Sequence, residues 1–407
     1  MKTPHTVVVV HGRYQFRGGE DEVFEAETRL LEERGHRVIR LTAEAPNLGG
    51  FRSRAHLALN ALWSGQWYKR LRTLLADQSV DVLHIHNFFP VISPSVFYAC
   101  NEARVPVVQT LHNFRLICPA ATLYRAGQLC ERCVGRPFAW PAIWHGCCRG
   151  SRSQSAVVAA MLGVHRLLGT WQQKVDLYVA LTQFARDQLV RGGLPPDRVT
   201  VKPNFVHPDP GMGGHGGGFA LYVGRLYPEK GINTLLPAWR KLGAPIPLKV
   251  IGEGPLSAAV AAEAGRSGNV AWLGRRSRAE MLSCMQQANF LLVPAAWYEP
   301  FGLVAIEAFS TGLPVIVSGH GGLAEIVEPG RNGLHFRPGD AADLAAKVEW
   351  AWSHPQEMVR MGQQARRTFE QKYTAEHNYG LLMEAYRAAI ARARRLRPAE
   401  LHPVESA

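Results

Sequence analysis

The hydrophobic positions of the chain form short continuous apolar runs that alternate with stretches of helical spacing. The first half contains such runs at residues 6–11, 37–41, 81–86, 106–111, 177–181 and 199–202. The second half contains them at 220–224, 248–252, 270–273, 289–293, 314–317 and 334–336. Most runs are apolar at every position rather than at alternate ones, which is typical of strands in a parallel sheet that helices cover on both faces. The pattern predicts an α/β protein.

A break in this alternation divides the chain. Residues 206–218 read Val-His-Pro-Asp-Pro-Gly-Met-Gly-Gly-His-Gly-Gly-Gly, a composition typical of a flexible linker. We therefore expect two doubly wound domains, at 1–205 and 219–375, and a final helix over 376–396 that crosses back to the first domain. Two such domains enclose a cleft lined by the carboxyl ends of both sheets, where ligands of doubly wound folds bind.

The clearest candidate for chemistry is a pair of carboxylates, Glu299 and Glu307, in the segment Glu-Pro-Phe-Gly-Leu-Val-Ala-Ile-Glu. The segment joins an apolar strand to a helix whose first turn is expected to comprise Phe301, Gly302 and Leu303. Free amides and the dipole at a helix start bind phosphate, and Gly302 lets a phosphate approach the backbone. A carboxylate grips a vicinal diol, so Glu307 suits a ribose and Glu299 suits hydroxyls of a sugar. Two unrelated glutamates are the alternative.

A second motif, Gly-Arg-Leu-Tyr-Pro-Glu-Lys-Gly at 224–231, also lies between a strand and a helix. Arg225, directly after Gly224, and Lys230 are expected to project into the cleft. Two cations there suit a diphosphate, and they would stabilise the charge that grows on a leaving nucleoside diphosphate. An unrelated pair of surface cations is the alternative.

A third, weaker motif is Gly18-Gly19, after the first strand and before a helix. Its backbone amides suit a phosphate, but a plain loop is an equally good interpretation. The spacing matches neither the G-x-G-x-x-G fingerprint nor a phosphate-binding loop with its Lys-Ser/Thr. Glu20, Asp21 and Glu22 are interpreted as acidic residues that complement the dipole of the helix they open.

Composition and charge restrict the class of protein. Apolar residues make up 47% of the 407 residues, and no apolar run approaches the ~20 residues of a membrane-spanning helix. The apolar start Val7–Val10 is too short for a secretory signal, so a cytoplasmic protein is expected. The net charge of +13 is uneven, because residues 51–174 hold 14 Lys or Arg against 4 Asp or Glu. This excess predicts an anionic partner such as a membrane surface, a lipid-linked diphosphate or nucleic acid, unless it is plain solvated surface charge.

On these motifs the chain resembles the retaining glycosyltransferases of family 4, which have the GT-B fold of two Rossmann-like domains facing a cleft. The resemblance runs over nearly the whole chain and includes Gly321-Gly322 followed by Glu325. It implies transfer of a sugar from a nucleoside diphosphate sugar to an acceptor, with retention at the anomeric carbon and without a catalytic metal or other cofactor. The sequence has no clear Asp-x-Asp motif, which agrees with the last point.

The resemblance also assigns roles within the cleft. In that family the residues that match Arg225 and Lys230 bind the donor diphosphate. The residue that matches Glu307 binds the ribose, and the one that matches Glu299 binds the donated sugar. Gly274-Arg275 matches the segment that holds the base, and His112 matches a residue beside the transferring sugar. The candidate catalytic residues are therefore His112, Arg225, Lys230 and Glu299. The candidate donor-binding residues are Gly18, Gly19, Gly224, Arg225, Lys230, Gly274, Glu299, Phe301, Gly302, Leu303 and Glu307.

Retention without an evident enzymic nucleophile fits a front-face displacement. In this scheme an oxygen of the leaving diphosphate accepts the proton of the acceptor hydroxyl while Arg225 and Lys230 hold the diphosphate. His112 then bonds the donor sugar or the departing phosphate and does not act as a general base.

The first domain of such a fold holds the acceptor. His84, His86 and Asn87 end a predicted strand, and His86-Asn87 is the best candidate for acceptor contact, with a structural strand-end pair as an equal alternative. Residues 51–75 and 153–174 combine basic with apolar and aromatic positions, as helices lying on an anionic membrane do. Such helices would suit a peripheral protein on the inner membrane face, acting on a lipid-linked or saccharide intermediate of cell-surface polysaccharide synthesis. Core-packing helices with basic outer faces are the alternative.

The chain has seven cysteines, an odd number that argues against a disulfide framework. Cys118, Cys130, Cys133 and Cys147 lie in an insertion at about 114–150 that is rich in Gly, Pro and aromatic residues. Four thiolates with one C-x2-C spacing suit a structural zinc. Free or transiently oxidised thiols are the alternative, and an iron–sulfur cluster is less expected.

Other functions remain open from the sequence. A nucleotide-sugar epimerase of the same fold would turn over the donor without an acceptor, whereas a glycan phosphorylase would typically need a longer chain. A nucleic-acid-binding protein using the basic half would bind DNA or RNA with steep salt dependence. It would leave Glu299 and Glu307 unexplained, and no nucleic acid is expected as a partner.

Overall fold

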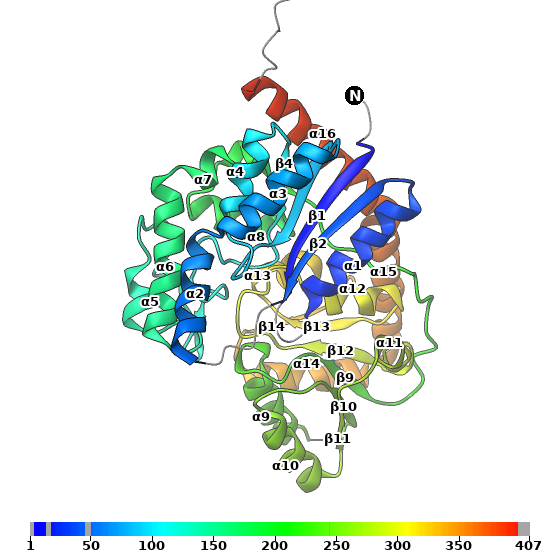
Figure 1. Ribbon diagram of the computed structural model, residues 1–407. Coiled ribbons are helices and arrows are strands. Elements are labelled where there is room, and N and C mark those ends of the chain that lie inside the picture. Colours follow the sequence, from blue (N-terminus) through cyan, green and yellow to red (C-terminus); the bar gives the residue numbers. More distant parts are fainter. Residues whose placement is uncertain (1–3, 14–17, 45–49, 244, 398–407) are drawn as a thin grey trace, which may run out of the picture.

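Two parallel six-stranded sheets form the framework of the protein (Figure 1). The computed structural model describes residues 4–13, 18–44, 50–243 and 245–397, apart from the side chains of 50–54. The first sheet has the strand order β2-β1-β3-β4-β7-β8 and the second β11-β10-β9-β12-β13-β14. Both sheets are covered by helices, so the α/β, Rossmann-like fold class predicted from the continuous apolar runs is confirmed.

The first sheet carries alternating side chains to two separate cores. Its strands are β1 (Thr6–Arg13), β2 (Arg37–Glu44), β3 (Val82–Asn87), β4 (Val107–Thr110), β7 (Leu177–Ala180) and β8 (Val199–Val201). Its accompanying helices are α1 (Gly19–Glu33), α2 (Gly50–Leu62), α3 (Gly65–Asp77), α4 (Ser95–Glu102), α6 (Arg152–Leu167), α7 (Thr170–Gln173), α8 (Gln183–Arg191) and the 3-10 turn η1 (Pro196–Arg198). Val8 and Val10 pack into the core beneath α3, α4 and α6, whereas Val7 and Val9 pack against Phe24 of α1. The period of two along β1 therefore places apolar residues on both faces.

The second sheet repeats this arrangement. Its strands are β9 (Ala220–Val223), β10 (Leu248–Ile251), β11 (Val270–Gly274), β12 (Phe290–Val293), β13 (Val315–Ser318) and β14 (Gly333–Phe336). Its helices are η2 (Pro228–Lys230), α9 (Ile232–Lys241), α10 (Ser257–Ser267), α11 (Arg278–Gln287), α12 (Leu303–Ser310), α13 (Gly321–Ile326), α14 (Ala341–Ser353) and α15 (Pro355–Lys372). Leu291 and Val293 enter one core of this domain, and Phe290 and Leu292 enter the other.

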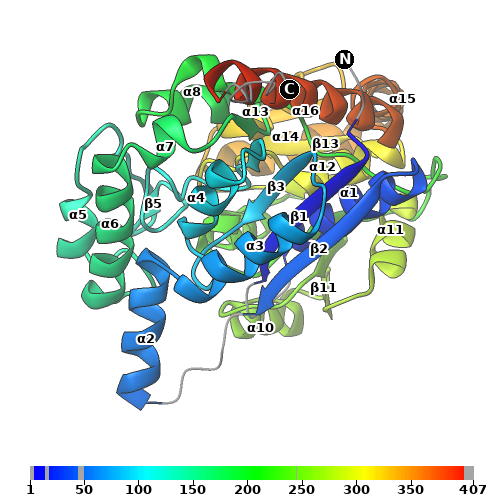
Figure 2. The same ribbon diagram turned by 45° about the horizontal axis from the view of Figure 1, so that its top comes forward.

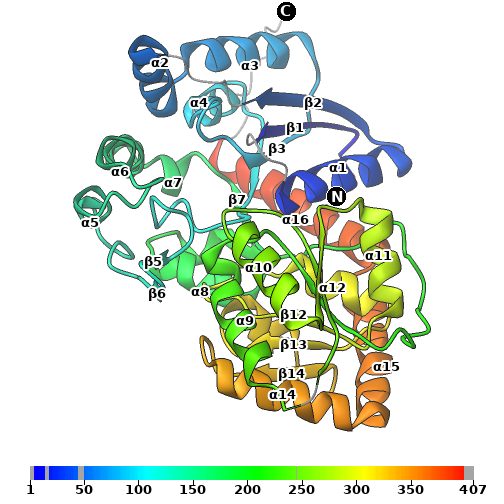
Figure 3. The ribbon, with the colours of Figure 1, turned by 90° about the horizontal axis from the view of Figure 1, so that it is seen from below.

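The last helix, α16 (Ala375–Leu396), lies against the first sheet. Its buried residues Leu382 and Tyr386 belong to the same core as Val7 and Val9 of β1. In Figure 3 this red helix runs between the two halves of the molecule.

Residues 206–218 contain no helix or strand, yet they are held against the second domain. The Gly213 amide donates to the Thr311 carbonyl at 2.8 Å, and the Gly217 amide donates to the Gln287 carbonyl at 2.9 Å. The two halves also touch directly, because Thr182 Oγ1 donates to the Pro300 carbonyl at 2.9 Å.

Residues 114–150, the predicted insertion, lie at one side of the first domain (Figure 2). They contain the hairpin of β5 (Tyr124–Arg125) and β6 (Gln128–Leu129) and the short helix α5 (Trp140–Trp144). Helix α6 packs against both α5 and α2.

The two basic-aromatic segments, 51–75 and 153–174, are only partly buried. Trp67 of α3 and Trp171 of α7 lie in the core of the first domain, which agrees with the core-packing alternative for these residues. Trp63 and Leu167 of the same segments are exposed. The interpretation of the segments as helices lying on a membrane therefore stays a prediction, which concerns their exposed apolar residues.

Candidate functional site

The two strongest motifs meet in one contact. Lys230 Nζ lies 2.6 Å from Glu299 Oε2, and Trp297 Nε1 donates to the same carboxylate oxygen at 2.9 Å. Lys230 Nζ also lies 4.9 Å from the centre of the Trp297 ring. The backbone makes this approach possible at Gly231, whose φ is +81° and whose added Cβ would lie only 1.7 Å from the Pro294 carbonyl oxygen. The turn after β9 and the loop after β12 are thus locked together.

Arg225 lies at the open edge of the same turn. It follows Gly224 at the end of β9 and is exposed, with its guanidinium carbon 5.2 Å from the centre of the Tyr227 ring. The chain packs closely behind it, because a Cβ on Gly252 would lie 1.9 Å from the Gly224 carbonyl oxygen. Gly274, the candidate base-binding glycine at the end of β11, accepts a hydrogen bond from the Gly252 amide at 2.8 Å. The ends of β9, β10 and β11 therefore lie side by side.

Helix α12 begins two residues after Phe301, the first residue of the expected first turn. Leu303 is its first residue, Gly302 caps it with φ +104°, and Phe301 lies buried before it. Glycine suits this position, because L side chains rarely adopt a φ of +104° and an added Cβ would also lie 2.4 Å from Leu323 Cδ2. Phe301 therefore supports the turn from the core and contributes no free helix-start amide.

Gly321 and Gly322 lie under Glu299. The Gly322 amide donates to the Glu299 carbonyl at 2.8 Å, and a Cβ on Gly322 would lie 2.6 Å from the Pro300 carbonyl oxygen. Glu325, in contrast, faces the first domain, where it accepts from the amides of Gln183 and Phe184 at 2.9 and 2.8 Å. It caps α8 and ties the two domains together.

Glu307 is buried within α12 with a cation in front of it. Its Oε1 lies 3.5 Å from Arg278 of α11, and Arg278 also reaches Glu22 of α1 at 3.9 Å across the cleft. Burial raises the pKa of Glu307 to about 7; Arg278 opposes the shift and Glu22 adds to it. A carboxyl group whose pKa is shifted this far by burial, beside a charged partner, is a candidate functional residue.

The Gly18-Gly19 loop brings the first domain to the start of α12. A Cβ added to Gly19 would lie 3.6 Å from Leu303 Cδ2. The Gly18 amide is occupied by Asp21 Oδ2 at 2.8 Å, which caps α1.

Glu20 is a site residue that the sequence analysis did not single out. Its carboxylate oxygens lie 3.5 Å from the amides of Asn87 and Asn113. Burial, then Asp21, raises the pKa of Glu20 to about 8, although Arg115, Asn113 and Arg225 oppose the shift. The sequence did carry a signal for this role, because Glu20 directly follows Gly18-Gly19 at the end of a strand. We interpreted Glu20 instead as a residue that complements the helix dipole.

His86 and Asn87 are engaged internally. Asn87 Nδ2 donates to the Gly12 carbonyl at 2.7 Å, and its Oδ1 accepts from the Phe89 amide at 3.0 Å. His86 is buried and contacts His112, whose Nε2 lies 3.0 Å from His86 Nδ1. These contacts agree with a structural role for the pair. His86 and Asn87 also line a small pocket together with half-buried His112, so acceptor contact stays a prediction.

The four cysteines of the insertion share one neighbourhood. Burial raises the pKa of the Cys133 thiol to about 12, and the thiols of Cys118, Cys147 and Cys130 add to the shift. In the described part of the chain, however, the group of potential ligand atoms that lie within 4.8 Å of one another is that of Glu27, His84 and His86. The sulfurs are near one another without forming a closed tetrahedral cage.

An exposed basic and aromatic surface covers the insertion. Trp140 and Trp144 are 54% and 67% exposed, and the guanidinium carbons of Arg136 and Arg152 lie 5.7 and 5.6 Å from their ring centres. A hollow of about 500 Å³ opens between α5 and Arg132. None of the helices described by the structure is long and apolar enough to cross a bilayer.

Comparisons with known proteins bear on the fold and the family of the chain. The glycogen synthase of Mycobacterium tuberculosis is 35% identical over 152 residues, which make up 36% of each chain, so the match spans little more than a third of that enzyme. The phosphatidyl-myo-inositol mannosyltransferase of Mycobacterium leprae is 25% identical over 289 residues, 68% of this chain and 66% of that one. Anabaena HepE in complex with UDP-glucose superposes with a TM-score of 0.66 at 16% identity, over 94% of this chain and 99% of its own, and shows the fold.

Two family models match consecutive parts of the chain. The one described as Glycosyltransferase Family 4 matches residues 17–210, and the one described as Glycosyl transferases group 1 matches residues 214–368. Together with the two facing Rossmann-like domains, these matches show that the chain belongs to the group 1, family 4 glycosyltransferases of GT-B fold.

Proposed function

We propose that this protein transfers a sugar from a nucleoside diphosphate sugar to an acceptor hydroxyl with retention of anomeric configuration. The observation that carries the proposal is the 2.6 Å contact between Lys230 and Glu299, which joins a cation for the diphosphate to a carboxylate for the sugar. The UDP-glucose complex of HepE, a protein of the same fold, supports a nucleotide sugar as donor.

The donor is proposed to lie along the carboxyl ends of the second sheet. Glu307 accepts hydrogen bonds from the ribose diol, and the base lies beside Gly274. Arg225, Lys230 and the free amides at the start of α12 hold the diphosphate. Glu299, fixed by Trp297, binds hydroxyls of the sugar.

The proposed chemistry is a front-face displacement. The acceptor oxygen forms a bond to the anomeric carbon while the bond to the diphosphate oxygen breaks on the same face. That oxygen takes the acceptor proton, so the nucleoside diphosphate leaves without a separate general base. Arg225 and Lys230 stabilise the charge that develops on it, the role that a divalent cation has in other transferases.

Removing either cation from the diphosphate site is expected to lower the rate of transfer. Arg225→Ala and Lys230→Ala should each cost about 3 kcal/mol of transition-state stabilisation, or roughly 100- to 1,000-fold in kcat. Lys372→Ala, a loss of the same charge at an exposed position on α15, is the control. The assay screens a panel of nucleotide sugars for transfer, with the product anomer read by NMR. Near-normal turnover in both variants, turnover only of the donor without an acceptor, or an inverted product would contradict the proposal.

Glu307→Gln is expected to stabilise the empty protein while weakening nucleotide binding. The pKa of Glu307 is raised from 4.5 to about 7, so its ionisation opposes folding increasingly as the pH rises through this interval. The variant should therefore be more stable by up to about 3 kcal/mol at pH 8 and nearly unchanged at pH 4.5. UDP affinity should fall on the order of tenfold, because a charged acceptor of two hydroxyls is lost.

Thermal unfolding at the two pH values and calorimetric titration with UDP check this trade-off. Glu384→Gln, at an exposed position of α16, serves as the control. Equal free energies of unfolding for Glu307→Gln and the wild type at pH 8 would show that ionised Glu307 does not destabilise the folded protein.

We further propose that the acceptor is lipid-linked or part of a growing saccharide and that the protein binds the membrane peripherally through the insertion. Exposed Trp140 and Trp144 with Arg136 and Arg152 beside them match the chemistry of an anionic interface. The mannosyltransferase relative, which is named for a phosphatidylinositol substrate, supports such an acceptor.

Vesicles test the membrane surface directly. The protein should sediment with vesicles that contain anionic phospholipid, less so at high salt because screening weakens the attraction. Changing Trp140 and Trp144 to Ser should lower the partition coefficient about tenfold, since two interfacial anchors are lost. Leu396→Ser, an exposed apolar position elsewhere, should leave it unchanged. Equal partitioning of all variants would exclude this surface.

We propose finally that the insertion binds one structural zinc through Cys118, Cys130, Cys133 and Cys147, whose sulfurs would close in around the metal. Purified protein should contain about one zinc per chain, and the Cys130→Ser, Cys133→Ser double variant should lose it. Cys284→Ser, outside the insertion, should retain it. Metal analysis of the three proteins decides the point, and a zinc-free wild type would exclude the site.

A further inference from the structure

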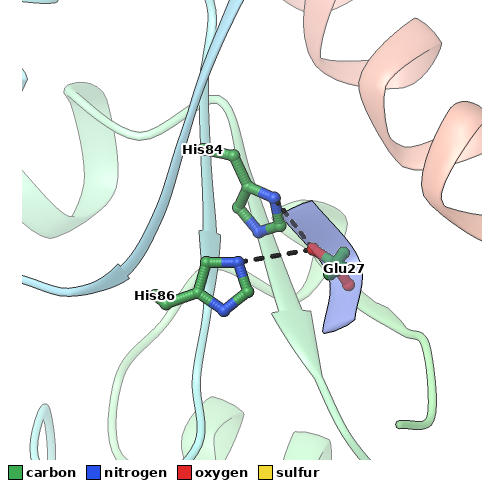
Figure 4. A group of neighbouring side chains, drawn as sticks. All are labelled: Glu27, His84 and His86. Carbon is green, nitrogen blue, oxygen red and sulfur yellow. Dashed lines mark ion pairs between the residues drawn. The ribbon is translucent and has the colours of Figure 1, made fainter. Parts of the chain in front are cut away.

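A chain of buried polar side chains runs from the end of the first sheet to His112. Lys202 Nζ, directly after β8, lies 2.7 Å from Glu27 Oε2 of α1. Glu27 Oε1 lies 3.4 Å from His86 Nε2, and His86 Nδ1 lies 3.0 Å from His112 Nε2. Figure 4 shows His86 and His84 both directed at the Glu27 carboxylate. Three elements therefore place Lys202, Glu27 and His86 one after another behind His112, a residue of the proposed sugar site.

The charges along this chain are set by burial and by Lys202. Burial opposes ionisation of Glu27, but the Lys202 ammonium, followed by His86 and His84, outweighs it and holds the pKa of Glu27 well below its usual range. Burial is also the largest cause that lowers the pKa values of His86 and His112, and both imidazoles are therefore neutral at pH 7. The chain thus consists of an ion pair followed by two neutral rings.

A neutral imidazole carries one proton, and the carboxylate decides where it lies. Glu27 Oε1 only accepts hydrogen bonds, and among the described residues neither it nor His86 Nε2 makes an aligned hydrogen bond, although the two atoms lie 3.4 Å apart. His86 therefore directs an Nε2–H toward Glu27, which leaves a lone pair on its Nδ1. That lone pair faces His112 Nε2 at 3.0 Å, so His112 must donate from Nε2 and keep its own lone pair on Nδ1.

We propose that Glu27 and His86 are positioning residues that fix His112 in the Nε2–H tautomer, so that its Nδ1 accepts a hydrogen bond from a hydroxyl of the donor sugar. The role of His112 toward the sugar rests on the proposed function, whereas the arrangement of Glu27, His86 and His112 does not. In this tautomer His112 Nδ1 cannot form a hydrogen bond with the departing phosphate, because the nitrogen and the phosphate oxygen would both be acceptors. The ring receives a fixed orientation before the donor binds, which is the usual contribution of an outer hydrogen-bond partner.

His84 lies equally close to Glu27 but does not belong to this chain. Its Nδ1, 3.2 Å from Glu27 Oε1, already meets the Tyr386 hydroxyl at 2.9 Å, and its Nε2 meets Thr110 Oγ1 at 2.8 Å. Both ring nitrogens are thus engaged, and neither reaches His112. His84 is therefore a matched control, with the same strand, burial and carboxylate neighbour.

The grouping of Glu27, His84 and His86 within 4.8 Å also resembles a metal site, but its charges oppose one. The Lys202 ammonium already neutralises Glu27 at 2.7 Å, and both residues are only 1% exposed. A divalent cation would add two further positive charges to this buried space, at a solvation cost that a single carboxylate does not offset. The arrangement suits a hydrogen-bonded relay.

The tautomer of His112 tests the proposal without any substrate. Long-range ¹H–¹⁵N spectra of histidine-labelled protein distinguish the two neutral tautomers, and His112→Gln identifies the signal. The wild type and His84→Gln should show His112 as the Nε2–H form. His86→Phe should show a mixture of both forms, and His86→Asn, whose side-chain oxygen can replace the Nδ1 acceptor, should restore part of the preference. An Nδ1–H form in the wild type, an unchanged tautomer in His86→Phe or a stoichiometric metal that the Cys130→Ser, Cys133→Ser double variant retains would overturn the proposal.

Kinetics with the best donor adds a second readout. His86→Phe should lower kcat on the order of 10- to 100-fold, by analogy with the loss of outer-shell partners, while UDP affinity stays unchanged because His112 faces the sugar. His84→Gln should change neither. Equal kcat for His86→Phe and His84→Gln would overturn the proposal even where both proteins are folded. The expected tautomers in a protein that transfers no sugar would contradict the proposed function alone.

Discussion

Strands that all run in one direction deliver their following loops to a single edge of the sheet, and the site depends on this constraint. The turn after β9 supplies Arg225 and Lys230, and the loop after β12 supplies Glu299. Because β9 and β12 are neighbours in the sheet, these loops meet even though about 70 residues separate them, and Lys230 reaches Glu299 at 2.6 Å. The close packing at Gly231 leaves no space for a side chain between the two loops. The contact is therefore a consequence of topology, and the first sheet repeats it when β3 and β4 bring His86 to His112.

Two desolvated carboxyl groups in the cleft carry an electrostatic cost in the native state. The pKa values of Glu20 and Glu307 are raised to about 8 and about 7, mainly by burial, although each group has an arginine near it. A fold selected only for stability would replace such groups by neutral ones, since each one weakens the native state wherever it must ionise. Their retention indicates a ligand that repays the cost, and a nucleoside diphosphate with a ribose diol supplies both the anion for the arginines and the donors for a carboxylate. Stability and function therefore oppose each other at these positions.

The fold could be predicted from the sequence because a continuous apolar run indicates a strand that is buried on both faces of its sheet. This pattern is local to the chain and needs no tertiary information. The sequence also predicted that the Arg225–Lys230 turn and the Glu299 loop share one edge, and the contact between Lys230 and Glu299 agrees with this. Prediction from the sequence failed where local pattern and tertiary position differ. The aromatic residues Trp67 and Trp171 have the same amphipathic spacing whether protein or lipid covers them. Glu27 reads as an ordinary helix-face glutamate, and only the return of the chain through Lys202 and α16 shows that it is buried beside two histidines.

The proposed relay gives the two sides of the reacting carbon opposite hydrogen-bonding characters. On the proposed diphosphate side, Arg225, Lys230 and the amides of α12 only donate. On the proposed sugar side, Glu299 and, in the proposed tautomer, His112 Nδ1 only accept. As the bond to the leaving oxygen stretches, negative charge moves toward the donors and positive charge grows on the sugar ring, next to the acceptors. Groups already oriented in this way need not reorganise during the reaction, which is the main source of electrostatic catalysis. A proton on His112 Nδ1 would reverse one of these dipoles, and the buried Lys202–Glu27 pair, far from solvent exchange, is the element of the fold that prevents it.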